Sequence, residues 1–166
     1  MIRMGIMVQR RCVFMKRWGL LGLVLLLCIL TCACSHEERG TDALLGEQMA
    51  RTENLPMGEI YRSDAIEGEC GYFSERLAAT TYGEGAVMHC FPLIEEYAIY
   101  LSSFPEPCEI AVFRCYEASD ADRIAEMCLS RIEQMRIVLA GTTFRARADN
   151  ATVRVEGRLV IMQVLP

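Results

Sequence analysis

Lysine is almost missing from this sequence, because Lys16 is the only one in 166 residues. The chain beyond it therefore has no amine that could form a Schiff base with a carbonyl substrate. Histidine is scarce as well, with only His36 and His89. These absences exclude lysine-based covalent catalysis after the N-terminal stretch, and they leave few candidates for a histidine general base.

Closely spaced cysteine pairs are also absent beyond the N-terminal stretch. The five cysteines of that part lie seven or more residues apart: Cys70, Cys90, Cys108, Cys115 and Cys128. A structural zinc site or a thioredoxin-type centre would need a pair such as Cys-x-x-Cys. The sequence therefore predicts no metal site and no cofactor.

Positive charge is concentrated at the N-terminus, where Arg3, Arg10, Arg11, Lys16 and Arg17 precede the first acid. Residues 34–166 hold twelve arginines and twenty-two acids, an excess of ten negative charges. A surface of that sign repels phosphate backbones. We therefore expect no nucleic-acid partner, and no feature of the sequence predicts an oligomer.

An apolar run follows the basic stretch and ends in a cysteine. Trp18 to Ala33 carries no charge, and it is shorter than the roughly 20 residues that a membrane-spanning helix needs. Its length, the upstream cations and the small residues before Cys34 are typical of a secretory signal peptide. Met15 would itself make a compact start for such a signal, so the start codon stays open between Met1 and Met15.

The end of the run, Thr31-Cys32-Ala33-Cys34, resembles a lipobox, in which a diacylglyceryl group is attached to a cysteine before cleavage. We expect the lipid on Cys34, with residues 1–33 as the signal peptide and residues 34–40 as the lipidated cysteine and a short tether. Cys32 is a less suitable acceptor because Thr31 precedes it. The alternative is an uncleaved signal anchor. Both interpretations place residues 35–166 outside the cytoplasm, and the lipid would hold them on the outer face of a bacterial cell membrane.

Residues 41–166 have the length of one modest domain. We predict a first helix from Thr41 or Asp42 to about Glu53, followed by a loop-rich region over residues 57–92 in which only residues 74–80 look helical. Alternating residues over 95–101 and 109–116 predict two strands that form a hairpin. A helix over 119–139 follows, with a capping box at its start and one buried stripe: Ala121, Ile124, Ala125, Cys128, Ile132, Met135 and Leu139.

The C-terminal part predicts a second hairpin. Residues 144–148 suggest a further extended piece, and residues 152–156 alternate between apolar and polar side chains. The final run, residues 159–165, is apolar on both faces, which is typical of a central strand or one covered by a helix. The predicted fold class is α+β: a mainly antiparallel sheet of two hairpins with helices on one face, preceded by a signal peptide.

The lipobox and several short segments of the domain resemble the bacterial lipoproteins that carry domain of unknown function 4358. The segments are Tyr82-Gly83, Glu95-Glu96-Tyr97, Tyr100-Leu101-Ser102-Ser103, residues 109–113, residues 120–122 and the hairpin over residues 153–164. The resemblance covers about residues 41–165 and implies a surface lipoprotein of α+β type. It supplies no activity and no catalytic residue. The sequence departs from that family in its many cysteines and in residues 84–92.

The five cysteines of the domain are an odd number, so at least one has no partner within the chain. Cys108 and Cys115 frame one predicted strand and would lie roughly 23 Å apart, which is beyond the limit of about 7 Å between the Cα atoms of a disulfide. Cys128 falls within the buried stripe. Cys70 and Cys90 lie in the loop-rich region over residues 57–92, which contains several glycines, and they are the preferred disulfide pair. The alternative is that all five thiols are reduced core residues.

No catalytic residue can be assigned from the sequence. His89 and Cys90 are adjacent, but neighbours in a strand point to opposite faces, which argues against a Cys–His pair. We therefore favour a non-catalytic, membrane-anchored binding or interaction module with a cell-wall or protein partner. The alternative is an exported thiol-dependent or hydrolytic enzyme with its site near His89 and Cys90.

Overall fold

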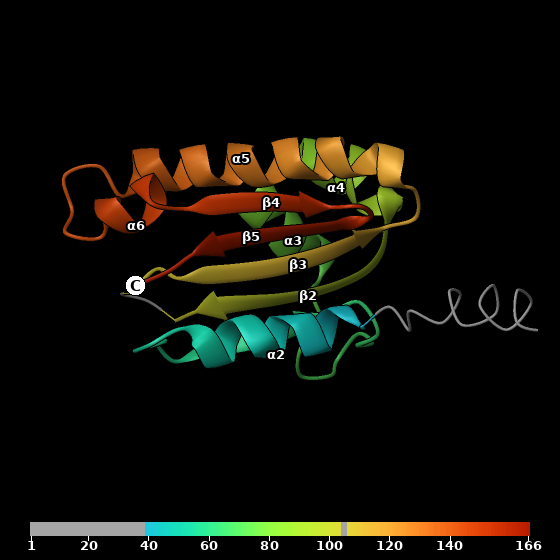
Figure 1. Ribbon diagram of the computed structural model, residues 1–166, viewed down its shortest axis with the longest axis horizontal. Coiled ribbons are helices and arrows are strands. Elements are labelled where there is room, and N and C mark those ends of the chain that lie inside the picture. The colour runs from blue at the N-terminus through green and yellow to red at the C-terminus, as the bar shows by residue number, and fades with distance from the viewer. Residues whose placement is uncertain (1–38, 104–105) are drawn as a thin grey trace, which may run out of the picture. The chain divides into compact units, whose positions relative to one another are not determined.

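A five-stranded antiparallel sheet forms the centre of the computed structural model, which describes residues 39–103 and 106–166 (Figure 1). Its strands follow the order β1-β2-β3-β5-β4 and are β1 (Gly58–Arg62), β2 (Ile94–Ser102), β3 (Glu109–Cys115), β4 (Thr152–Glu156) and β5 (Leu159–Val164). The two predicted hairpins are β2–β3 and β4–β5, and β3 pairs with β5 to join them. The predicted α+β class is confirmed, while the expected signal peptide lies outside the described residues.

Helices cover both faces of the sheet. The helical elements are α2 (Thr41–Arg51), α3 (Glu75–Tyr82), α4 (Glu84–His89), α5 (Ala121–Val138), α6 (Arg145–Asp149) and the short 3-10 helices η1 (Phe91–Leu93) and η2 (Ala118–Asp120). Helices α3 to α6 gather on one face, which we call the α5 face, whereas the sequence predicted that all helices, the first one included, would lie on a single face. Helix α2 alone covers the other, the α2 face. The reason is that α2 has its own apolar side around Leu45, and the α5 face is already filled.

The α5 face holds the larger core. Ile124, Cys128 and Ile132 of the predicted α5 stripe are fully buried against the sheet, with Met135 close behind. The prediction of the stripe is therefore confirmed. The predicted capping box is wrong, since η2 leads directly into α5 and no side chain caps the helix.

The α2 face holds a smaller core. Leu45 packs on it with Tyr100, Ile110 and Ile161. Because strand β3 is covered on both faces, every one of its residues is buried. Strand β5 lies between β3 and β4 and is largely buried, which confirms the prediction that the last apolar run is central.

The region over residues 57–92 was predicted to be mostly loop with a helix at residues 74–80; α3 confirms that helix, but the region also contains β1 and α4, so the prediction that the rest is loop is wrong. Strand β1 begins at Gly58, where a Cβ atom would lie 2.3 Å from the carbonyl oxygen of Leu101, so glycine is needed for this close pairing. The predicted extended piece over residues 144–148 is also wrong. Helix α6 stands there, and it buries Ala148 under α5.

Candidate functional site

The predicted lipidation residue, Cys34, lies outside the described residues, so its modification stays a prediction. The first described residue, Arg39, follows it by five positions. Within residues 39–103 and 106–166, no helix has the length and apolar character needed to span a bilayer.

A groove of about 420 Å³ opens between the α3–α4 hairpin and α5 beside Cys90, and we call it the Cys90 groove. Its walls are formed by residues of α3, α4 and α5 together with the connections that follow them: Tyr82, Gly83, Gly85, Ala86, Cys90, Arg123, Glu126, Met127 and Ser130. Gly83 has a φ of +96°, which links α3 to α4 without a side chain. The wall beside it is therefore made of small residues.

Cys90 lines this groove, but its neighbour His89 does not. His89 is the last residue of α4 and is exposed, whereas Cys90 is partly buried against the core of the α5 face. Burial raises the pKa of the Cys90 thiol, Arg123 opposes that shift, and Glu126 adds to it. A thiol with a raised pKa is mostly protonated near neutral pH and is a weak nucleophile. The geometry therefore provides a thiol in a groove without the activation that thiol catalysis requires.

Arg123 is unusual among the arginines of the described residues. All of them take part in an ion pair except Arg123 and Arg76; the paired ones are Arg39, Arg51, Arg62, Arg114, Arg131, Arg136, Arg145, Arg147, Arg154 and Arg158. Arg76 lines a second groove of about 420 Å³ on another side of the α3–α4 hairpin, with Glu75, Ala79, Glu84, Val87 and Met88. Both unpaired guanidinium groups thus border concave surfaces, where they are available to an anionic group.

A buried carboxylate, not anticipated from the sequence, lies deeper in the α5 face. Glu109 is 1% exposed, accepts a hydrogen bond of 2.7 Å from the Tyr82 hydroxyl and forms an ion pair of 3.0 Å with Nε of Arg131. Burial, with a further contribution from Glu109, holds the pKa of Tyr82 well above its ordinary value. The phenol therefore stays a donor. The cluster connects α3 and α5 to the first residue of β3, which is a structural role.

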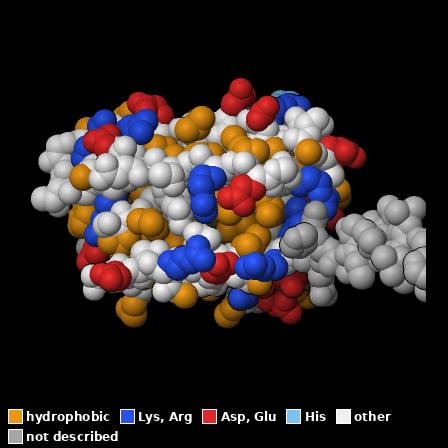
Figure 2. Space-filling model, in the orientation of Figure 1, with side chains coloured by type: hydrophobic (Ala, Val, Ile, Leu, Met, Phe, Trp, Pro, Cys, Tyr) orange, Lys and Arg blue, Asp and Glu red, His pale blue; other side chains and the backbone are white. Residues whose placement is uncertain are grey.

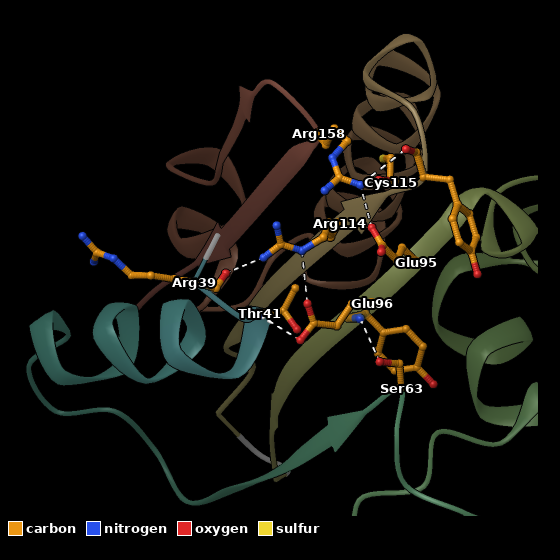
Figure 3. Close-up of polar contacts among 10 residues, drawn as sticks. Arg39, Thr41, Ser63, Glu95, Glu96, Arg114, Cys115 and Arg158 are labelled. Atoms are coloured by element: carbon orange, nitrogen blue, oxygen red, sulfur yellow. Dashed lines mark hydrogen bonds and ion pairs between the residues drawn. The ribbon is translucent and has the colours of Figure 1, made fainter. Parts of the chain in front are cut away.

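A second polar cluster ties the start of the domain to the sheet, and we call Arg39, Thr41, Glu96 and Arg114 the N-terminal network (Figure 3). Nε of Arg114 lies 3.1 Å from Glu96, whose other oxygen accepts the backbone N–H of Thr41 at 3.1 Å. Arg114 also donates to the Arg39 carbonyl. Because Arg114 is buried near the end of the central strand β3, the first described residues are fixed to the α2 face beside the end of β3 and the start of β2.

The thiols of the described cysteines are free, with Cys70 exposed, Cys90 partly buried and the other three buried. Cys108 precedes β3 and Cys115 ends it. Burial raises the pKa of Cys108 to about 11 and that of Cys128 further still. The Cys70–Cys90 disulfide stays a prediction. Peptide mapping without reduction tests it: a linked peptide supports the bridge, and alkylation of both cysteines before any reduction contradicts it.

In the described part of the chain, no three histidine, cysteine, aspartate or glutamate side chains come together as a metal site. The three tyrosines of the predicted hairpin do not share one surface either. Tyr97 stacks edge-on against Phe73 on the α5 face, Tyr100 is buried on the α2 face, and Tyr116 is exposed. Two of them serve the cores, and only Tyr116 is available at the surface.

Comparisons with known protein families, with curated proteins and with solved structures find no match to this chain. Its function therefore has to be argued from its own residues.

Proposed function

We propose that the chain is an exported bacterial lipoprotein, anchored through Cys34 to the outer face of the cell membrane, whose domain is a non-catalytic binding or interaction module. The resemblance to the lipoproteins with domain of unknown function 4358 agrees with this proposal. The cations upstream of the apolar run, the length of that run and the small residues before Cys34 support the exported location.

The observation that carries the non-catalytic part is the chemistry of the Cys90 groove. Its thiol has a pKa raised by burial, and His89 is not among the groove residues. A hydrolase or thiol enzyme would need a base within hydrogen-bond reach of the nucleophile. The groove instead offers an unpaired cation at Arg123, a carboxylate at Glu126 and a hydroxyl at Ser130, which are groups suited to contact with a partner.

The excess of acidic over basic side chains, and the way they are distributed, indicates which class of partner the domain can bind. Acidic and basic side chains lie next to one another over the face seen in Figure 2, and neither sign gathers into one patch. Phosphate backbones are bound by clusters of cations. A cell-wall component or another surface protein that carries an isolated anionic group, placed at Arg123, agrees better with this distribution.

Metabolic labelling with palmitate tests the anchor. Cys34→Ala should abolish both the label and the processing of the precursor, while the matched variant Cys32→Ala should retain them. Normal labelling and cleavage of Cys34→Ala would show that Cys34 is not the lipid acceptor.

Co-sedimentation with purified cell walls tests the groove. Arg123→Ala should lower the fraction bound, because it removes the unpaired cation of the Cys90 groove. Arg76→Ala is the matched control, since Arg76 is also unpaired and borders the other groove. Equal binding by both variants and the unchanged protein would exclude the Cys90 groove as the contact site for the cell wall.

A further inference from the structure

We propose that the domain stands upright on the bilayer, with the end of the sheet at which α2 begins facing zwitterionic lipid headgroups and Tyr116 at headgroup level. We call this the near end. It comprises the start of β2, the end of β3 and the β4–β5 turn. The opposite or far end carries the start of β1, the β2–β3 connection and the C-terminus (Figure 1). The proposal rests on the lipid anchor at Cys34 proposed above.

The reach of the tether is the first argument. Five residue steps separate Cys34 from Arg39, and fully extended chain covers at most about 18 Å over that length. The tether joins the domain at a fixed place, because the N-terminal network holds Arg39 and Thr41 on Glu96 and Arg114. Strand β2 starts beside that network and runs about 30 Å to the far end, at roughly 3.3 Å per residue. The near end is therefore the one that the anchor draws to the bilayer.

Tyr116 lies at this end. It follows Arg114 by two residues, about 7 Å of chain, and its backbone N–H donates to the Leu93 carbonyl just before β2. Its carbonyl accepts a hydrogen bond from Arg158, which also pairs with Glu95 at 2.7 Å. The side chain is 57% exposed. Tyrosine is enriched where membrane and water meet, because its ring is apolar and its hydroxyl is hydrated.

The competing posture places the domain flat on the outer side of α2. A helix lying in a membrane interface needs a broad apolar face. The exposed positions of α2 include Asp42, Ala43, Gly46 and Ala50, and none of its large apolar side chains is exposed. Its apolar side, with Leu45, is already used against the sheet. The upright posture leaves that packing intact and requires only Tyr116 and its neighbours at the headgroups.

Charge selects the type of lipid surface. At the near end, Arg158 pairs with Glu95 and Arg62 pairs with Asp42 at 2.7 Å, so these cations are already compensated. The domain as a whole carries excess negative charge. An anionic bilayer would repel it within a Debye length of about 8–10 Å. A zwitterionic surface permits the contact.

Single tryptophans can measure this orientation, because Trp18 is the only tryptophan and is lost when the chain is cleaved before Cys34. The probes are Tyr116→Trp and Val155→Trp at the near end, Ala50→Trp on the outer side of α2, and Met57→Trp at the far end, where Met57 is 87% exposed. Each full-length lipidated variant is reconstituted in phosphatidylcholine vesicles that carry bromine high on the acyl chains. Bromine quenches tryptophan emission on close approach.

The upright posture predicts that Tyr116→Trp and Val155→Trp lose the largest share of their emission and that Met57→Trp and Ala50→Trp lose little. Stronger quenching of Ala50→Trp than of both near-end probes would overturn the proposal in favour of the flat posture. Equal, negligible quenching of all four probes on vesicles that carry the protein would overturn it as well.

Vesicle flotation separates this proposal from the anchor itself. Protein that fails to float, or unsubstituted protein that still shows tryptophan emission from Trp18, contradicts the processed lipoprotein and the orientation together. Protein that floats without tryptophan emission, followed by the wrong order of quenching, contradicts only the orientation.

Discussion

The two faces of the sheet are covered in different ways and connect to different parts of the chain. Four helices cover the α5 face, which holds the large core, the buried Glu109 cluster and the Cys90 groove. One helix covers the α2 face, which holds a small core and the N-terminal network. The comparison shows that the two faces have different roles. The α5 face supplies most of the buried contacts that stabilise the domain, and the α2 face binds the start of the domain, which follows the predicted lipid anchor.

Glu109→Ala should give the largest loss of stability, because it removes the buried acid that pairs with Arg131 and accepts the hydrogen bond from Tyr82. Breaking one partner of a buried pair costs about 3–5 kcal/mol. Urea unfolding monitored by circular dichroism measures the loss. Glu109→Gln retains an acceptor for Tyr82 and should lose less. A change below about 0.5 kcal/mol for the alanine variant, the level of surface substitutions, would contradict the role assigned to this cluster.

Ile132→Ala probes the core of the α5 face directly. Ile132 is 2% exposed, and truncation of such a residue costs about 2–5 kcal/mol. Leu129 lies on the same helix but is 56% exposed, so Leu129→Ala should stay within about 0.5 kcal/mol. Leu45→Ala provides the counterpart on the α2 face. It should fall toward the lower end of the same range, since a single helix can shift to close the cavity. A larger loss for Leu45→Ala than for Ile132→Ala would reverse the comparison.

Much of the α5 face could be predicted from the sequence because its signals are local. The three- and four-residue spacing of Ile124, Cys128 and Ile132 depends on one helix only, and the C-terminal apolar run, interrupted only by Gln163, identified a central strand. Strand β1 was missed because Gly58 and Glu59 break the alternation. Its place is set by pairing with β2, which only the folded chain shows.

The polar clusters could not be predicted, because they join residues that are distant in sequence. Glu109 looks like an exposed residue at the start of a strand until Tyr82, twenty-seven residues earlier, and Arg131 converge on it. Arg114 looks like the outward residue of a strand until the start of α2 covers it. The Cys90 groove requires α3, α4 and α5 together. In each case the sequence shows the charge, but the partner is set by tertiary packing.

Arg114→Ala tests the α2 face and should cost less than the changes in the Glu109 cluster. It removes the ion pair with Glu96 and the hydrogen bond to Arg39, and Glu96 keeps partial contact with water. Hydrogen bonds to charged groups contribute about 1.5–3 kcal/mol, and we expect a loss in the lower part of that range. The start of α2 should also become more accessible to protease. Unchanged stability together with unchanged cleavage would contradict the N-terminal network.

Alkaline pH should lower the stability through one thiol on each face. The pKa of Cys128 on the α5 face and of Cys108 on the α2 face lies above the ordinary 9.0, in both cases chiefly because of burial. Above pH 9 the unfolded chain loses these protons while the folded chain keeps them. Stability is therefore complete below pH 9 and falls as the pH rises, by up to about 1.4 kcal/mol per pH unit for each thiol.

Urea midpoints between pH 8 and pH 10.5 measure this effect. Cys128→Ala and Cys108→Ala should each flatten the decline, and each variant serves as the control for the other. A midpoint that does not fall above pH 9 in the unsubstituted protein would show that these thiols are not held protonated by the fold.

Hydrogen exchange under native conditions tests the separation of the two faces most directly. Amides of α5 should exchange only through global unfolding, because that helix lies on the larger core, whereas amides of α2 should exchange through a smaller, local opening. Arg114→Ala should accelerate exchange in α2, and the free energy of opening should remain larger for α5 than for α2. Equal protection of α2 and α5, changing together in Arg114→Ala, would contradict the account and show that the two faces form one cooperative unit.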